Sequence, residues 1–249
     1  MKTLIITVAG TATRFNRDTQ EPTLKCLYNI GGVKNTLLYR ILDKARDFDE
    51  YIIVGGYLYD RLTDFVETGL AEFKDKIKVV FNREFAGYGS AYSLILGIEN
   101  SSPVSDEIVF VEGDLYYDAA GFEKVCKSRR NVFTVNHDLI MSRKSVVVYE
   151  NAEHYLRYIY DTRHECLRID EPFLAVYNSA QVWKFADVLR LRNVLDNLTS
   201  EQKRGTNLEI IQDYFGKLGA EEYEMVQFDL WFNCNTVEDY KNVFSIIAR

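Results

Sequence analysis

The sequence has no apolar run long enough to cross a bilayer, and it does not begin with a basic segment followed by a signal-peptide core. It has only three prolines and no Pro/Gly-rich stretch, which argues against a flexible hinge between domains. Excess positive charge is also missing. The formal net charge is −7, which argues against nonspecific binding to nucleic acid or anionic membranes. We therefore expect a cytoplasmic protein with no nucleic-acid partner and no insertion into a membrane.

Residues for nucleophilic or redox chemistry are sparse. The four cysteines are far apart and form no CxxC pair, which is typical of a chain with free, reduced thiols. There is no G-x-S-x-G elbow, no G-x-x-x-x-G-K-[ST] loop, no H-E-x-x-H zinc motif and no G-x-G-x-x-G dinucleotide motif. The three histidines lie 17 and 10 residues apart, which is not a metal-binding spacing. Nucleophilic catalysis by the protein itself is therefore not expected.

The pattern of apolar residues predicts the fold class. A length of 249 residues is near the upper limit for one hydrophobic core, which favours a single domain (1–249) with an insertion over two domains. In the first half, apolar runs at 4–8, 51–55, 78–81 and 107–111 alternate with helical stretches at 36–46, 58–73 and 90–99. This alternation predicts an α/β fold, with a Rossmann-like, mostly parallel mixed sheet flanked by helices.

The second half is less regular. Segments 131–136, 145–149, 155–160 and 173–177 are rich in β-forming residues with polar breaks, and they predict a small β-rich insertion. Apolar residues at helical spacing predict helices over 180–198 and 208–218.

The N-terminal segment joins a buried strand to a loop of five small residues, which let backbone N–H groups come close to a ligand. These residues are Ala9, Gly10, Thr11, Ala12 and Thr13. Arg14 and then Lys25 add positive charge. The pattern favours a phosphate cradle at the end of a strand, and an ordinary turn between a strand and a helix is the alternative.

Together with Pro22-Thr23-Leu24-Lys25, this loop resembles the signature of nucleotidyltransferases that join a nucleoside triphosphate to a phosphorylated small molecule. The family usually has Gly where this chain has Ala12, and its Pro and Lys are usually adjacent. The resemblance implies that Arg14 and Lys25 are catalytic and bind the phosphates. It also implies a nucleotide-binding half at about 1–130 and an acceptor-binding half at about 131–249.

Two segments resemble the family's metal-binding positions. Asp114 follows a buried strand, where a carboxylate can hold Mg²⁺ against phosphate oxygens or can cap a turn. The C-terminal stretch 231–240 (WFNCNTVEDY) places Asn235 as the second ligand, with Asn233 as the alternative. The resemblance thus implies Mg²⁺ as the cofactor. Alternation along the strand points Glu112 away from the side of Asp114.

Residues 82–97 (NREFAGYGSAYSLILG) resemble the family's base-recognition segment, and Tyr92-Ser93-Leu94 resembles an element of the phosphocholine cytidylyltransferase-like branch. The resemblance implies that Gly89 and Ser90 read the base of CTP, partly through backbone amides. A surface loop without a ligand is the alternative.

The implied activity is transfer of CMP from CTP to a phosphorylated or phosphonylated small molecule, with release of pyrophosphate. For the acceptor, Arg143 and Lys144 are candidates for a phosphate clamp. Aromatic residues could surround a quaternary ammonium such as choline; they are Tyr116, Tyr158, Tyr160, Tyr177 and Trp231. The alternatives are a sugar-1-phosphate nucleotidyltransferase that uses UTP, dTTP or another triphosphate, and a noncatalytic nucleotide-binding domain of the same fold. The acceptor and the oligomeric state stay open.

Overall fold

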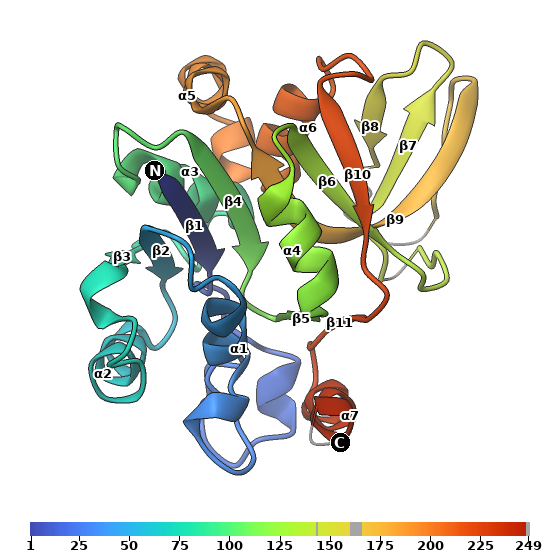
Figure 1. The fold of residues 1–249 in the computed structure, drawn as a ribbon. Helices are drawn as coiled ribbons and strands as arrows, with labels where there is room; N and C mark the ends of the chain where they lie inside the picture. The colour runs from blue at the N-terminus through green and yellow to red at the C-terminus, as the bar shows by residue number, and fades with distance from the viewer. Residues whose placement is uncertain (143, 160–165, 248–249) are drawn as a thin grey trace.

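The computed structural model describes residues 1–142, 144–159 and 166–247. Seven strands form the body of its main sheet: β1 (Lys2–Thr7), β2 (Glu50–Gly55), β3 (Ile77–Phe81), β4 (Glu107–Glu112), β6 (Asn131–Asn136), β9 (Phe173–Phe185) and β10 (Tyr223–Gln227). Their order across the sheet is β3-β2-β1-β4-β9-β6-β10 (Figure 1). Six of the seven run in the same direction and only β9 is reversed, which confirms the predicted mostly parallel mixed sheet.

Helices cover both faces of this sheet (Figure 1). They are α1 (Leu37–Lys44), α2 (Tyr59–Gly69), α3 (Ser90–Asn100), α4 (Ala119–Lys127), α5 (Val188–Asn197), α6 (Leu208–Phe215) and α7 (Val237–Ile247), with short 3-10 turns at Phe15–Arg17, Val33–Asn35, Lys74–Lys76 and Gln202–Arg204. Leu4 and Ile6 of β1 pack with α1, α2 and α4, while Ile5 packs with α3, α5 and α6. Each such side chain contributes about 1.5–3 kcal/mol on burial, so a strand that is apolar on both faces needs helices on both sides.

A small antiparallel extension lies beyond the main path of the sheet. It consists of β7 (Val147–Asn151), β8 (Leu156–Tyr158) and the first half of β9. The last half of β9 lies between β4 and β6. This extension is the predicted β-rich insertion, although the end of the expected strand 155–160 lies outside the described residues.

The helix predicted to start at residue 180 is wrong in its first part. Ala180, Trp183 and Phe185 continue β9, and α5 begins only at Val188, where the side chain of Asp187 caps its N-terminus. These β9 residues are buried on both faces, because the strand is central in the sheet and helices cover both sides. Burial on both faces removes the two-residue alternation of a strand, so the apolar spacing fitted a helix equally well.

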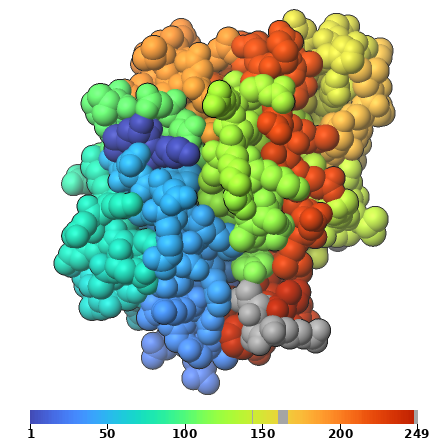
Figure 2. Space-filling model, in the orientation of Figure 1, coloured from blue at the N-terminus to red at the C-terminus, as the bar shows by residue number. Residues whose placement is uncertain are grey.

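The C-terminal segment returns to the N-terminal half of the chain. Strand β11 (Trp231–Asn233) pairs antiparallel with β5 (Leu115–Tyr117), which follows β4 almost directly. Helix α7 then packs Tyr240 and Val243 against Phe15 of the N-terminal loop. Figure 2 shows the red C-terminal atoms beside the blue N-terminal ones at the lower end of the molecule. The chain between β11 and α7 thereby reaches the carboxyl ends of β1 and β4.

Strands from both halves of the chain join the same sheet. The division at about residue 130 into a nucleotide-binding and an acceptor-binding half stays a prediction. Within the described ranges, no helix has the length and apolar character needed to cross a membrane.

Candidate active site

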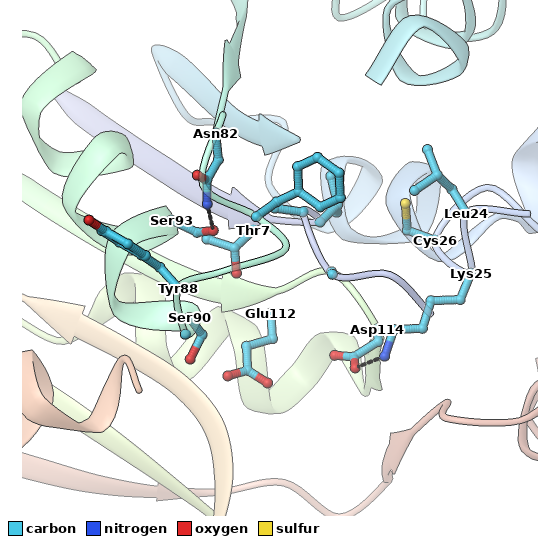
Figure 3. A pocket seen from close by; sticks show the side chains of 16 residues that line it. Thr7, Leu24, Lys25, Cys26, Asn82, Tyr88, Ser90, Ser93, Glu112 and Asp114 are labelled. Carbon is cyan, nitrogen blue, oxygen red and sulfur yellow. Dashed lines mark hydrogen bonds and ion pairs between the residues drawn. The ribbon is translucent and has the colours of Figure 1, made fainter. Parts of the chain in front are cut away.

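A cavity of about 290 Å³ opens at the carboxyl ends of β1 and β4, beside the N-terminus of α3 (Figure 3). This is the edge at which open, parallel α/β sheets bind their ligands. The cavity is lined by Thr7, Val8, Ala9, Gly10, Leu24, Lys25, Cys26, Asn82, Phe85, Tyr88, Gly89, Ser90, Ser93, Glu112, Gly113 and Asp114. Much of the predicted nucleotide site, drawn from four separate stretches of sequence, is therefore brought together here.

The loop after β1 presents backbone N–H groups. Among the described residues, nothing accepts a hydrogen bond from the N–H groups of residues 10–14. A methyl group at Gly10 would meet no atom within 4 Å, so open space lies against this backbone. Ala12 has a φ of +51°, the conformation that glycine adopts most easily, so the backbone keeps the turn despite the missing glycine. Thr11, Ala12 and Thr13 continue the loop beyond the lining of the cavity.

Lys25 and Asp114 form an ion pair inside the cavity (Figure 3). Their side chains are 23% and 14% exposed. The second oxygen of Asp114, Oδ1, is buried and has no hydrogen-bond partner among the described residues. The backbone here is fixed because Gly113 N donates to Thr7 O at 3.0 Å and Cys234 N donates to Asp114 O at 2.8 Å. Asp114 is thus held in place with one oxygen left for a ligand.

Asn235 reaches the same ion pair from the C-terminal segment. Its side-chain oxygen accepts a hydrogen bond from Arg14 Nη2 at 2.8 Å and lies 3.4 Å from Lys25 Nζ. Its side-chain nitrogen donates to Asn233 Oδ1 at 2.7 Å. Asn233 therefore orients Asn235 and does not replace it, so the geometry favours Asn235 over Asn233 as the candidate ligand.

The oxygen donors fit Mg²⁺ when a phosphate substrate completes the site. Within the described residues, no three His, Cys, Asp or Glu side chains come together as a metal centre. Mg²⁺ is usually held by one or two carboxylates, with substrate phosphates and water as the remaining ligands. The unpartnered oxygen of Asp114 meets this requirement, and Asn235 adds a neutral oxygen nearby.

Glu112 is the cavity residue that the sequence reasoning missed. Alternation pointed it away from Asp114, but β4 ends at Glu112 and the chain turns at Gly113, so both carboxylates line the cavity (Figure 3). Glu112 accepts hydrogen bonds from Asn207 Nδ2 at 2.6 Å and from Gln181 Nε2 at 3.2 Å. Burial, and then the charge of Asp114, raise the pKa of Glu112 to about 7. The sequence signal that could have identified Glu112 is the stretch Glu112-Gly113-Asp114, in which two acidic residues flank a glycine at the end of a predicted strand.

Gly89 and Ser90 line the cavity, but the amide of Gly89 is not free for a base. Its N–H donates to the carbonyl of Arg204 at 2.8 Å, and a methyl group at Gly89 would lie 2.1 Å from Gly205 O. Glycine is required here by the close approach of this neighbouring loop. The hydroxyl oxygen of Ser90 accepts a hydrogen bond from Asn207 N at 3.0 Å, which also ties α3 to the loop before α6.

The remaining side chains at this end of the cavity form a partly aromatic wall. Asn82 Nδ2 donates to Ser93 Oγ at 2.9 Å, and Asn82 Oδ1 accepts from Glu84 N at 2.9 Å, so Asn82 holds the loop in shape (Figure 3). Tyr88 supplies ring surface at this end (Figure 3), and Phe85 also lines the cavity. This end of the cavity therefore suits a flat, partly apolar group such as a nucleobase.

The two groups of residues predicted to contact the acceptor do not gather at this cavity. Lys144 is exposed in the turn before β7 and does not line the cavity, because β7 pairs with the outer half of β9, away from β4. Arg143 lies outside the described residues.

The described members of the predicted aromatic cage are dispersed over the structure and do not form a cage. Tyr158 is buried and its hydroxyl accepts from Trp183 Nε1 at 2.7 Å, while Trp231 Nε1 donates to Ala180 O at 2.7 Å. Tyr116 packs in the cluster around Phe15, Tyr177 does not line the cavity, and Tyr160 lies outside the described residues.

The cysteines near the site are structural. Burial raises the pKa of the Cys26 thiol to about 12 and raises that of Cys234 as well. Neither thiol is therefore ionised near neutral pH, which agrees with the expectation that the protein supplies no nucleophile.

Comparison with known proteins assigns the chain to a family. A family model described as "Domain of unknown function (DUF6564)" matches residues 21–247. The chain belongs to the DUF6564 family. No curated protein matches this DUF6564 chain.

Solved structures resemble the DUF6564 chain over nearly its whole length. A protein of Bacillus anthracis described as a glucose-1-phosphate thymidylyltransferase has a TM-score of 0.73 and 16% identity, with 99% of this chain and 95% of that chain covered. The inositol-1-phosphate CTP transferase of T. maritima has a TM-score of 0.73 and 16% identity, with coverage of 100% and 95%. The CTP:phosphocholine cytidylyltransferase of Streptococcus pneumoniae has a TM-score of 0.64 and 18% identity, with coverage of 99% and 99%. All three are named as nucleotidyltransferases, which confirms the predicted fold.

Proposed function

We propose that this chain is a nucleotidyltransferase that transfers CMP from CTP to a small phosphorylated or phosphonylated acceptor and releases pyrophosphate. One observation carries the proposal. Lys25, Asp114 and Asn235 converge beside the unpartnered amides of residues 10–14, at the carboxyl ends of adjacent parallel strands. Amides and cations around a carboxylate with a free oxygen suit a metal-bound polyphosphate better than any other ligand class.

The protein's task in this reaction is charge neutralisation and positioning. A phosphate oxygen of the acceptor attacks the α-phosphorus in line, the bond to the bridging oxygen breaks, and pyrophosphate leaves with the electron pair. A phosphate dianion is already a nucleophile, so no general base is required. The amides of residues 10–14 and Arg14 bind the β- and γ-phosphates, which fixes the leaving group.

Lys25 is placed to act at the reacting phosphate. Its ammonium has three N–H donors, of which one is directed to Asp114 and a second to Asn235. One donor remains for an α-phosphate oxygen or the bridging oxygen. When bound, Mg²⁺ would be held by Asp114 and Asn235 and would supply positive charge to the α-phosphate.

Two kinds of observation support CTP and a small acceptor. Two of the structural neighbours are named for CTP, with inositol 1-phosphate and phosphocholine as their acceptors. The segment 82–97 also resembles the cytidylyltransferase branch. The dispersed tyrosines remove the sequence argument for choline itself, so the proposal is limited to small phosphates and phosphonates.

The test is release of pyrophosphate, with each of the four ribonucleoside triphosphates and dTTP set against a panel of phosphorylated alcohols, phosphonates and sugar 1-phosphates, with Mg²⁺. We expect strong turnover with CTP and one non-sugar acceptor. Turnover with UTP or dTTP and a sugar 1-phosphate would move the assignment to a sugar-nucleotide enzyme. Binding of a triphosphate without turnover on any acceptor would indicate a noncatalytic nucleotide-binding domain.

A further inference from the structure

Glu112 is unusual for a site that binds polyphosphate, because it adds a second carboxylate close to Asp114. Among the described residues, its oxygens accept hydrogen bonds only from neutral amides, Asn207 Nδ2 and Gln181 Nε2. No cation of the described residues forms an ion pair with it, whereas Asp114 is paired with Lys25. A carboxylate without a cation beside it repels a nearby phosphate. This repulsion is offset where another part of the ligand donates hydrogen bonds to the carboxylate.

The position of Glu112 indicates which part of a nucleotide it meets. Tyr88 lies at one end of the cavity, and Lys25 and Asp114 lie at the other (Figure 3). Glu112 is drawn between Ser90 and Asp114, at the middle of this path. In a nucleotide the sugar lies between the base and the α-phosphate, so a nucleotide placed along this path brings its ribose to Glu112.

The hydrogen-bonding capacity of Glu112 matches a ribose. Each carboxylate oxygen can accept about two hydrogen bonds, and each has one protein donor: Asn207 for Oε1 and Gln181 for Oε2. One position on each oxygen therefore remains. Two adjacent hydroxyl groups, the 2′-OH and 3′-OH, supply one donor each. A carboxylate that binds the ribose 2′-OH is also the arrangement used in dinucleotide sites.

The carboxylate is held rigidly from two elements. Gln181 has a φ of +57°, a strained conformation for a residue with a side chain, at the irregularity where β9 changes register against β6. From there its side chain donates to Glu112 and accepts from Asn233 Nδ2 at 3.3 Å. Asn207 is fixed from the other side by its backbone bond to Ser90. The residue with this strained backbone is thus also the one whose side chain is hydrogen-bonded to Glu112.

From these observations we infer that Glu112 binds the 2′- and 3′-hydroxyl groups of the nucleotide and makes the site selective for ribonucleotides over 2′-deoxyribonucleotides. The inference rests on the proposed nucleotide site and is independent of the base and of the acceptor.

The test compares the binding of CTP, 2′-deoxy-CTP and 3′-deoxy-CTP by calorimetry, without an acceptor, and repeats the series with the base that binds best if that base is not cytosine. A lost hydrogen bond to a charged group is worth about 1.5–3 kcal/mol. Wild-type protein should therefore bind CTP roughly 10- to 100-fold more tightly than either deoxy form.

Two variants test the role of Glu112 itself. Glu112→Gln removes the charge, and Glu112→Asp keeps the charge but shortens the side chain by one methylene group. Both should weaken the binding of CTP, which loses two hydrogen bonds to Glu112, more than that of either deoxy form, which loses one, so that the ratio falls to about threefold or less.

Glu84→Gln, an exposed acid in the loop beside the cavity, is the control and should keep the wild-type ratio. Thermal unfolding of each variant separates misfolding from a change in selectivity, and the ratio is read from whichever of the two Glu112 variants folds. Equal binding of CTP and deoxy-CTP by wild-type protein would overturn the inference and leave the proposed function intact. So would a Glu112 variant that changes only the KM of the acceptor, or only the Mg²⁺ requirement. If no triphosphate binds, both proposals fail.

Discussion

At the scale of single residues, Lys25 is the side chain on which most of the site depends. It forms an ion pair with Asp114, 89 positions away, and reaches Asn235, 210 positions away. Lys25→Ala should lower turnover by roughly 100- to 1000-fold, the usual effect of removing one preorganised donor to the transition state. The measurement is kcat for pyrophosphate release with the best substrate pair.

The matched control for this change is Lys34→Ala, which removes an exposed lysine in the 3-10 turn Val33–Asn35, outside the cavity lining. It should keep wild-type kcat. A folded Lys25→Ala protein with unchanged kcat would remove Lys25 from the mechanism.

Gly10 and Gly89 both line the cavity but should respond differently to substitution. Space is open around Gly10, so Gly10→Ala should keep the wild-type stability but raise the KM for the triphosphate, because the new methyl group occupies the space of the phosphates. Gly89→Ala drives a methyl group into Gly205 O, so it should lower the free energy of unfolding by several kcal/mol. Urea unfolding and triphosphate KM together separate the two cases.

Gly87→Ala is the control for Gly10→Ala, because its methyl group also meets nothing within 4 Å but Gly87 is not part of the lining. An unchanged KM in Gly10→Ala would show that phosphates do not approach this backbone.

These residues also show what the sequence could predict. A strand followed by small residues and cations predicts a phosphate loop locally, and Gly10 and Lys25 do line the cavity, while their contacts to phosphate stay a prediction. The role of Gly89 depends on residues 204–205, more than a hundred positions away, and no local pattern reports that contact. Glu112 was misplaced because alternation holds only within a strand, and β4 ends at this residue.

At the scale of elements, the turn between β11 and α7 fixes the candidate metal site. Asp239 accepts hydrogen bonds from the backbone N–H groups of Asn235 and Thr236 at 3.0 and 2.8 Å, and Asp239 N donates to Thr236 Oγ1 at 3.1 Å. This is a capping box, which satisfies the free donors at the start of α7 and holds Asn235 in position. The capping motif could be read from the sequence, whereas its position beside Asp114 depends on the pairing of β5 with β11.

The dependence of turnover on Mg²⁺ should reflect the turn between β4 and β5, which carries Asp114, and the turn between β11 and α7, which carries Asn235. Asp114→Ala should abolish Mg²⁺-dependent turnover, while Asn235→Asp should keep it and lower the Mg²⁺ concentration needed, because a carboxylate adds charge where the amide has none. Titration of activity with Mg²⁺ checks both variants. Turnover that persists in EDTA, or normal Mg²⁺ dependence in Asp114→Ala, would exclude the proposed ligands.

The elements themselves were predictable to different degrees. Alternating strands and helices in the first half gave the correct type and order, because each strand is bounded by polar turns and each helix has one apolar face. The long strand β9 was divided wrongly, since its first five residues are exposed or half-buried and its last part is buried on both faces. Which strands are neighbours is a property of tertiary packing, and the reversed strand in the centre of the sheet has no local signal.

At the scale of the whole molecule, buried charge links stability to pH. Lys44, at the end of α1, donates to Arg40 O at 3.0 Å, and its ammonium lies 4.7 Å from the ring centre of Tyr116 and 5.0 Å from that of Tyr117 on β5. Burial, and then the charge of Arg40, lower the pKa of Lys44 to about 8. The loss of hydration on burial is the largest cause of this shift, and it disfavours the charged form.

The sign of the effect follows from this lowered pKa. Below pH 8, Lys44 is charged in both the folded and the unfolded chain, and the folded state carries the full cost of the buried charge. As pH rises from 8 to the ordinary lysine value near 10.5, Lys44 is neutral in the folded state but stays protonated in the unfolded chain. The cost of the buried charge therefore decreases over this range and is lost above pH 10.5.

Lys44→Met, of similar length and uncharged, should raise the free energy of unfolding by about 1–3 kcal/mol at pH 7 and by less at pH 10. Urea unfolding at both pH values measures this gap. Lys34→Met at an exposed position should show a gap that does not change with pH. A Lys44→Met protein that is no more stable than wild type at pH 7, or a gap that widens toward pH 10, would mean that the ring contacts stabilise the charge more than burial destabilises it.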